Sequence, residues 1–145
     1  MGNNMKTHVY EIMEKIEKES DLQKKKMLIW EHGQKSPFNM LWSLNFCDRI
    51  SLEIPEGVPP YKQDGETNED IFPSSLAQEI RKIGNCMVGV KIAKWKKEHI
   101  FIQVCEAIPL KDAEILVFAK DKALTELYPT ITKELITEIF PAYVK

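Results

Sequence analysis

The side chains that most readily bind metals are scattered along this 145-residue sequence. Its three histidines are His8, His32 and His99, and only His8 has a carboxylate at one-turn spacing, Glu11. A metal ion needs several imidazole, thiolate or carboxylate ligands brought together. The glycines of segment 84–89 also lack the Lys-Ser/Thr pair that ends a phosphate-binding loop. The sequence therefore predicts no metal site and no cofactor.

Three thiols, Cys47, Cys86 and Cys105, are the candidates for nucleophilic catalysis. A reactive cysteine needs a base or a positive field beside its sulfur. Cys105 falls on the apolar side of its expected helix and Cys86 adjoins Met87, which favours buried, inert thiols. The odd number of cysteines, with no C-x-x-C pair, favours free thiols in a reducing compartment over a disulfide framework. The sequence identifies no catalytic residue and leans against an enzyme.

The stretch from Lys91 to His99 is the strongest candidate binding segment, because it places a tryptophan among several lysines. From Leu76 to Ile100 there are six Lys or Arg residues against two Glu. Lysines neutralise phosphates, and an exposed tryptophan stacks on a base. The candidate nucleic-acid or nucleotide contacts are Lys94, Trp95, Lys96 and Lys97. The alternative is a solvated linker whose tryptophan fills the core under the lysine stems. A second run, Lys24–Lys26, extends this basic surface only if the fold brings the two runs together.

A proline-rich, acidic segment divides the chain. The run from Pro55 to Tyr61 cannot continue a helix or a central strand. From Ser51 to Ser75 there are six acids against Lys62 alone, and we predict an irregular loop over 51–75. Its prolines favour a rigid, polyproline-like ledge that presents Tyr61 and Lys62 for binding. The alternative is a passive crossing between helical layers, with Tyr61 in the core.

Apolar residues recur at helical spacing on both sides of this loop. Before it, the pattern predicts three helices: around 9–18, over 22–33 behind an Asp21 cap, and from Pro37 behind a Ser36 cap. After it, a Ser75/Gln78 capping box starts a fourth helix. The remaining three are a helix around 101–108, a central buried helix from Pro109 to Tyr128, and a last helix capped by Thr130 or Thr132. The predicted core residues are Ile80, Ile83, Phe101, Val104, Leu116, Phe118, Leu135 and Ile139.

Composition fits an ordinary globular chain, with 43% hydrophobic and 29% charged residues. The net charge of −2 argues against a wholesale nucleic-acid or membrane-surface binder. No apolar run approaches the length of a membrane span, and no stretch has the pattern of a signal peptide. We therefore predict a mostly α, compact multi-helix protein, with one domain over 1–145 and disorder in residues 1–4. We expect it in the cytoplasm.

Several motifs extend over nearly the whole chain from Met5. They are segment 36–46, P-E-G-x-P-P-Y-K at 55–62, segment 98–108, D-A-E at 112–114 with K-D-K at 120–122, and E-I-F-P at 138–141. On these residues the chain resembles a family of small uncharacterised proteins of T4-like tailed bacteriophages, many of them from cyanophages. It departs from that family at Gln63-Asp64, where a further proline is usual, and in the lysine-rich segment that precedes His99. The resemblance implies a phage protein acting in the cytoplasm of an infected bacterium, and it carries no known activity.

Three hypotheses follow, of which the least favoured is a small hydrolase or transferase with Cys or Glu chemistry. The first is a non-catalytic phage accessory protein that modulates host or phage machinery, such as transcription, replication or host defence, by binding a host or phage protein. The alternative is a nucleic-acid or nucleotide-binding protein that uses Lys91–Lys97. No membrane partner is expected, and self-association stays open, since the acidic loop and the basic stretch can pair within one chain or between copies.

Overall fold

The structure of this protein is a computed structural model that describes residues 8–61 and 74–145. Of these residues, 65% are helical and none lies in a named strand, so the mostly α prediction is confirmed. The elements in chain order are α1 (Val9–Lys18), α2 (Leu22–Gly33), α3 (Phe38–Phe46), α4 (Leu76–Glu79), the 3₁₀ helix η2 (Ile80–Cys86), α5 (Lys94–Ala107), α6 (Leu110–Lys120), α7 (Leu124–Leu127), α8 (Lys133–Ile139) and α9 (Pro141–Val144). The expectations for residues 1–4, and for 62–73 of the loop, lie outside the described residues.

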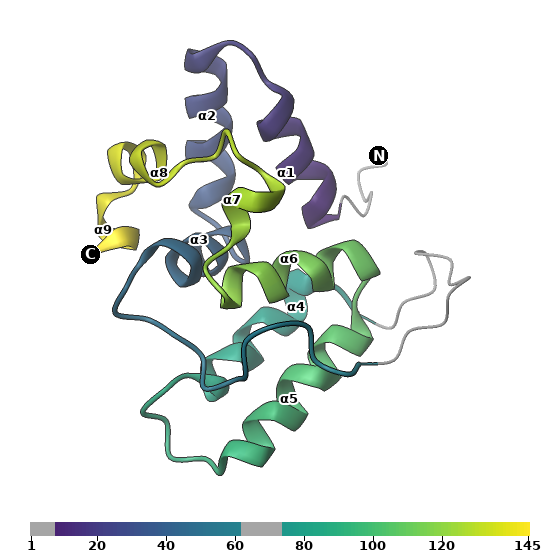
Figure 1. Ribbon diagram of the computed structural model, residues 1–145. Helices are drawn as coiled ribbons and strands as arrows, with labels where there is room; N and C mark the ends of the chain where they lie inside the picture. The colour runs from purple at the N-terminus through teal and green to yellow at the C-terminus, as the bar shows by residue number, and fades with distance from the viewer. Residues whose placement is uncertain (1–7, 62–73) are drawn as a thin grey trace.

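Helix α6 runs across the middle of the molecule (Figure 1). On one side lie α1, α2 and α8, and on the other lie α4, η2 and α5. Seven of its eleven residues are buried, as expected for a helix covered on nearly all sides. The sequence prediction of a central buried helix is therefore confirmed, although its predicted end at Tyr128 is wrong.

The end of α6 is set by Lys122, which has a left-handed backbone with φ +59°. The N–H of Ala123 donates to the carbonyl of Phe118, and the N–H of Lys122 donates to that of Ala119. This pair of bonds is the Schellman motif, which normally places glycine at the left-handed position. Because Lys122 stands there instead, the sequence carried no stop signal before Tyr128.

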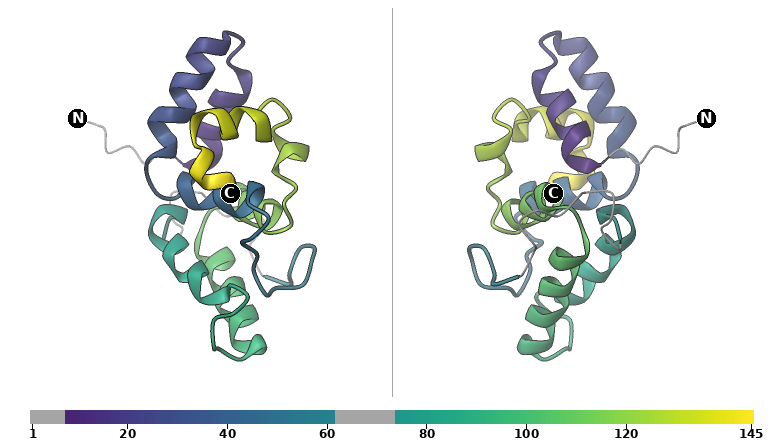
Figure 2. Two further views of the ribbon diagram at one scale, coloured as in Figure 1. Left: turned by 90° about the vertical axis from the view of Figure 1, so that its left-hand side faces the viewer. Right: turned by 90° about the vertical axis from the view of Figure 1, so that its right-hand side faces the viewer.

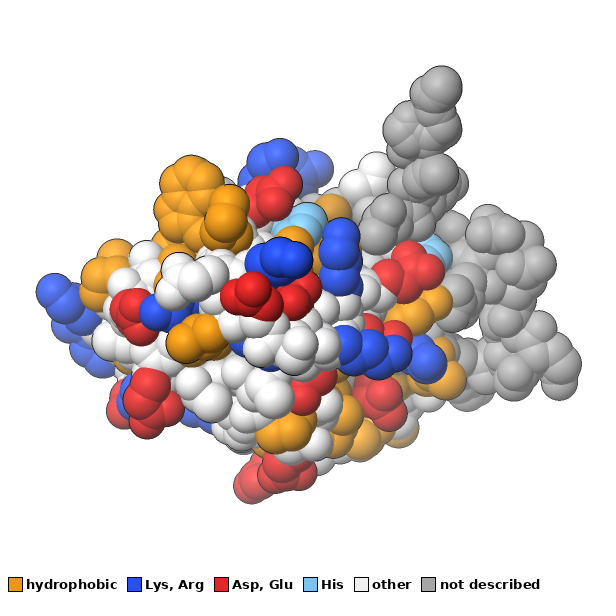
Figure 3. Space-filling view, turned by 90° about the horizontal axis from the view of Figure 1, so that it is seen from above, with side chains coloured by type: hydrophobic (Ala, Val, Ile, Leu, Met, Phe, Trp, Pro, Cys, Tyr) orange, Lys and Arg blue, Asp and Glu red, His pale blue; other side chains and the backbone are white. Residues whose placement is uncertain are grey.

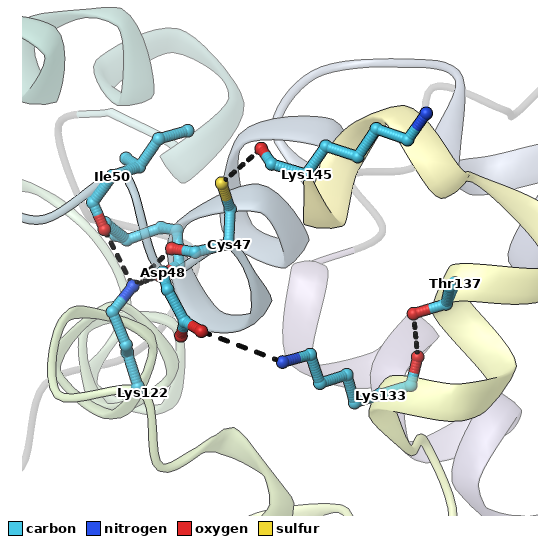
Figure 4. Close-up of polar contacts among 8 residues, drawn as sticks. Cys47, Asp48, Ile50, Lys122, Lys133, Thr137 and Lys145 are labelled. Carbon is cyan, nitrogen blue, oxygen red and sulfur yellow. Dashed lines mark hydrogen bonds and ion pairs between the residues drawn. The ribbon is translucent and has the colours of Figure 1, made fainter.

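The side chain of Lys122 gives a reason for that unusual choice (Figure 4). Its ammonium donates to the carbonyls of Leu44, Cys47 and Ile50 at 2.6, 2.8 and 2.7 Å. The last carbonyls of a helix have no partner within the helix, so Lys122 satisfies those at the end of α3. One residue thus ends α6 and caps α3.

The predicted N-caps divide into those that form and one that does not. Asp21 accepts from the N–H groups of Gln23 and Lys24, Ser75 from Gln78, and Thr132, rather than Thr130, caps α8. The Ser36 prediction is wrong, because α3 begins at Phe38 directly after Pro37. The helix predicted from Phe101 in fact begins at Lys94.

The core is one cluster that draws residues from both sides of α6. Six of the eight predicted core residues are buried, whereas Phe118 and Ile139 pack against the cluster while remaining partly exposed. The segment before the proline-rich run crosses beside η2, where Leu52 forms an isolated antiparallel bridge with Met87. The described part of the predicted loop, 51–61, contains no helix and stands out at one edge in the side views (Figure 2).

Candidate functional site

The connection from η2 into α5 forms one end of the molecule (Figure 1). We call residues 88–96 the α5 tip. Trp95 is 66% exposed and Val88 is 61% exposed, with Val90 at 37%. The side chains of Lys91, Lys94 and Lys96 are exposed in the same segment. The interpretation that Trp95 fills the core is therefore wrong.

The first turn of α5 has a charge distribution that does not favour helix formation. Its N-cap residue, Ala93, offers no side-chain hydrogen bond, and the turn contains no acidic residue. Lysines occupy helix positions one, three and four, close to the positive end of the helix dipole. Such placement costs a few tenths of a kcal/mol or more for each lysine. Helix stability therefore does not explain why positive charge is concentrated here.

Lys97 does not belong to the exposed set, although the sequence analysis included it. Its side chain is 1% exposed, and its ammonium donates to the Glu53 carboxylate at 2.7 Å and to the carbonyl of Met87 at 2.8 Å. The hydrogen bond and positive charge of Lys97 hold the pKa of Glu53 below its usual value. Lys97 thus fixes α5 to the segment around Glu53, and its ammonium is not available to a phosphate.

Backbone hydrogen bonds hold the loop ahead of α5. The N–H of Val88 donates to the backbone carbonyl of Ser51 at 3.0 Å, and the N–H of Ile92 donates to the backbone carbonyl of Val90 at 2.9 Å. Gly89 has φ +98°, a conformation that L-residues rarely adopt, with no other group near its missing side chain. At the surface, the ammonium of Lys96 lies 5.7 Å from the centre of the Trp95 ring. The tip is therefore an ordered turn that carries exposed side chains.

The other two predicted contacts do not join the tip. Tyr61 is partly buried and packs against the core cluster. Burial raises the pKa of its hydroxyl, and the charges of Cys105 and Glu114 add to the shift. Lys62 lies outside the described residues. The ledge therefore turns at least this aromatic ring toward the protein.

The second basic run is far from the tip. Helix α2 lies at the end of the molecule opposite the start of α5 (Figure 1). Lys25 is buried and donates to the Glu17 carbonyl and the Thr130 hydroxyl, and Lys26 pairs with Glu138 at 2.7 Å. On this end of the molecule, basic and acidic side chains are interspersed (Figure 3). The two lysine runs do not form one continuous basic surface.

The three cysteines are buried and free, as predicted for Cys86 and Cys105. Burial raises the pKa of Cys86 to about 11 and that of Cys105 to about 12, so neither is a thiolate near neutral pH. The thiol of Cys47 donates to the carbonyl of Lys145 (Figure 4). In the described parts of the chain, no three His, Cys, Asp or Glu side chains group closely enough to hold a metal ion.

Sequence reasoning missed Val88 and Val90, because two valines around a glycine give no helical or strand period. It also missed the contact between two motifs. The ammonium of Lys120 donates to the carbonyls of Pro55 and Gly57, and the Asp121 carboxylate accepts from the N–H of Gly57. The K-D-K motif therefore holds the proline-rich motif in place.

Comparison with known proteins gives one match. No curated protein and no solved structure matches the chain significantly. Among residues 8–61 and 74–145, no helix combines the length and apolar composition needed to cross a bilayer. The model of a family of unknown function (DUF6433) matches residues 12–126, a span that runs from α1 through α7 and includes the α5 tip and both interacting motifs. The chain belongs to this family of unknown function (DUF6433).

Proposed function

We propose that this chain is a non-catalytic interaction protein that docks through the α5 tip onto an acidic surface of a partner protein. The observation that carries the proposal is the co-location of exposed Val88, Val90 and Trp95 with three exposed lysines. Protein interfaces commonly combine an apolar, aromatic centre with a polar rim. Tryptophan is also among the residues that most often dominate binding energy.

Two features favour a protein over a nucleic acid. Aliphatic side chains such as Val88 and Val90 offer no stacking surface to a base, but they bury well against another protein. The basic charge is also local, because Lys97 is internally paired and the Lys24–Lys26 run lies at the other end of the molecule. A small basic rim around an apolar centre suits an acidic protein surface.

The setting belongs to the same proposal. The motifs that resemble proteins of T4-like tailed bacteriophages support a phage accessory protein acting in the cytoplasm of an infected bacterium. There, its partner would be a host or phage protein of transcription, replication or defence. The basic tip suits partners of this kind that present acidic surfaces.

A second candidate function, nucleic-acid binding, rests on the exposed ring of Trp95 beside Lys94 and Lys96. These are the two elements of a single-strand binding surface, a stacking platform and phosphate-neutralising charge. With three exposed lysines contributing, the log–log dependence of affinity on salt would have a slope of roughly −2 to −3.

A pair of tryptophan variants tests the proposal. Trp95→Ala should weaken binding of the full chain to its partner at least about tenfold, as loss of an interface anchor does. Trp30→Ala removes another exposed tryptophan, on α2, and should leave binding unchanged. The experiment captures partners from infected cells with the wild-type chain and measures their affinities for the wild-type and both variants by titration calorimetry.

Labelled single- and double-stranded oligonucleotides, titrated at two salt concentrations, form the second arm. Salt-dependent oligonucleotide binding that Trp95→Ala weakens would replace the protein proposal by the nucleic-acid one. Protein binding that is equally tight in both tryptophan variants would contradict the α5 tip as the docking surface.

A further inference from the structure

The proline loop, residues 54–60, is hydrogen-bonded to the buried side chain of Lys120 and to Asp121. The Lys120 ammonium donates to Pro55 and Gly57 carbonyls at 2.9 and 3.1 Å, and the N–H of Gly57 donates to Asp121 at 2.9 Å. Lys120 also pairs with Asp121 itself. A loop that only connects two helices does not need a buried ion pair to fix its conformation. The fixed conformation of this loop therefore suggests a role beyond connecting the helices.

The loop encloses a cavity against α5. Its volume is about 160 Å³, and its walls are the proline loop together with Glu98 and Ile102. These two residues of α5 lie one turn apart and face the loop. Pockets that take drug-sized ligands usually measure about 300–1,000 Å³, so this cavity is too small for a nucleotide. It is several times the volume of a water molecule, about 30 Å³, and is of a size for one amino-acid side chain.

The lining of the cavity combines apolar side chains with two carboxylates, those of Glu98 and the exposed Glu56. Pro55, Pro59 and Pro60 have no N–H, and the N–H of Gly57 is already bonded to Asp121. Glu98 contributes a carboxylate that is partly buried and forms no hydrogen bond or ion pair with any side chain in the described residues. An occupant that matches this lining brings an apolar stem and several donors.

We propose that this cavity binds a cationic side chain, arginine or lysine, of a partner polypeptide. Both side chains have an aliphatic stem that packs on apolar walls while the charged end reaches a polar group. A guanidinium or ammonium offers only donors, and its hydrogen bonds to a carboxylate are among the stronger ones in proteins. Lys94, one turn before Glu98, is exposed and does not form an ion pair with it, so the carboxylate is open to an external cation.

This site shares no residue with the α5 tip and differs from it in charge, although Glu98 lies one helical turn from Lys94 and Trp95. The tip presents lysines and Trp95 to an acidic surface, whereas the cavity presents Glu98 to a basic side chain. A partner that carries an acidic surface with a neighbouring arginine would engage both. Either site can fail without the other, because no residue is shared between them.

The test titrates N-acetyl-arginine amide into the full chain and follows the backbone amide signals by NMR. Saturable shifts are expected at Gly57, Val58 and Ile102, with a dissociation constant in the millimolar range. The citrulline analogue has nearly the same shape, but its urea is neutral and one NH2 is replaced by a carbonyl. It should bind about tenfold more weakly or worse, since its hydrogen bonds to the carboxylate come from an uncharged donor. The indole signal of Trp30, on α2 at the other end of the molecule, should not move.

Two isosteric variants localise the interaction. Glu98→Gln should weaken binding of the arginine amide about tenfold. Glu106→Gln, a matched change on the same helix outside the cavity, should leave binding unchanged. Ile102→Phe, which fills the cavity and keeps Glu98, should abolish the shifts, and its own spectrum shows whether it remains folded. Equal binding of arginine and citrulline amides, unchanged affinity in Glu98→Gln, or shifts confined to other residues would each overturn the proposal.

Discussion

At the residue scale, the lysines of this protein divide into two populations, one buried and hydrogen-bonded and one exposed. Lys25, Lys97, Lys120 and Lys122 donate to backbone carbonyls and are largely covered, whereas Lys94 and Lys96 extend into solvent. The sequence predicted that residues 94–97 form an exposed binding surface, and three of these four residues are exposed in the structure. It could not show that Lys97 pairs with Glu53, because that partner comes from a segment 44 residues earlier.

The pair between Lys97 and Glu53 predicts a dependence of stability on pH. Lys97 lowers the pKa of Glu53 in the folded protein below the ordinary value of 4.5. A lowered carboxylate pKa contributes stability that is present above the ordinary value and is lost as pH falls through the folded value. Glu53→Gln should therefore reduce the free energy of unfolding at pH 7, and the difference from wild type should shrink below about pH 4.5.

Urea denaturation at several pH values measures this difference. Glu56→Gln, at an exposed carboxylate on the proline loop, is the control for removing one surface charge. A Glu53→Gln penalty that stays the same from neutral to acidic pH would show that the ion pair does not contribute to stability.

At the element scale, the sequence predicted where helices lie better than where they end. The apolar period located α1, α2 and the centre of α6, and the polar caps Asp21 and Ser75 fixed two starts. The sequence analysis missed the first two turns of α5, because residues 94–100 are mainly polar and only Lys97 among them is buried. It also missed the end of α6, because Lys122 occupies a position where glycine would have been the signal.

Lys122 provides a prediction at this scale, since it links the ends of α3 and α6. Lys122→Met should destabilise the protein by about 2–3 kcal/mol, because three carbonyls lose a charged donor. Lys122→Gly loses the same donor but relieves the left-handed backbone, and it should be about 1 kcal/mol less destabilising than Lys122→Met. Chemical denaturation of both variants measures the two contributions.

The order of these two variants is the decisive result. If Lys122→Met were as stable as wild type, the hydrogen bonds of the ammonium would contribute nothing to stability. If Lys122→Gly were less stable than Lys122→Met, the left-handed conformation at this position would not carry the expected cost.

At the scale of the whole molecule, α6 joins the two sides of the fold. It packs against α1 and α3 on one side and α5 on the other, and the K-D-K segment at its end holds both the end of α3 and the proline loop. The tip and the cavity depend on this helix for their positions, since α5 and the proline loop are both fastened to it. The sequence predicted the buried helix from its composition, but it could not predict the arrangement of its neighbours, which is set by contacts between residues far apart in the chain.

The last prediction tests α6 as this common support. Leu116 is completely buried in its middle, and Leu116→Ala should reduce the free energy of unfolding by roughly 2–4 kcal/mol through lost transfer energy and a residual cavity. Leu110→Ala makes the same change at the exposed first residue of the helix, and its effect should stay within about 0.5 kcal/mol. Because both sides of the fold pack on α6, amide hydrogen exchange in Leu116→Ala should accelerate in α3 and α5 together. Acceleration on one side alone would mean that the two sides unfold independently, and a cost below about 1 kcal/mol would mean that Leu116 is not at the centre of the core.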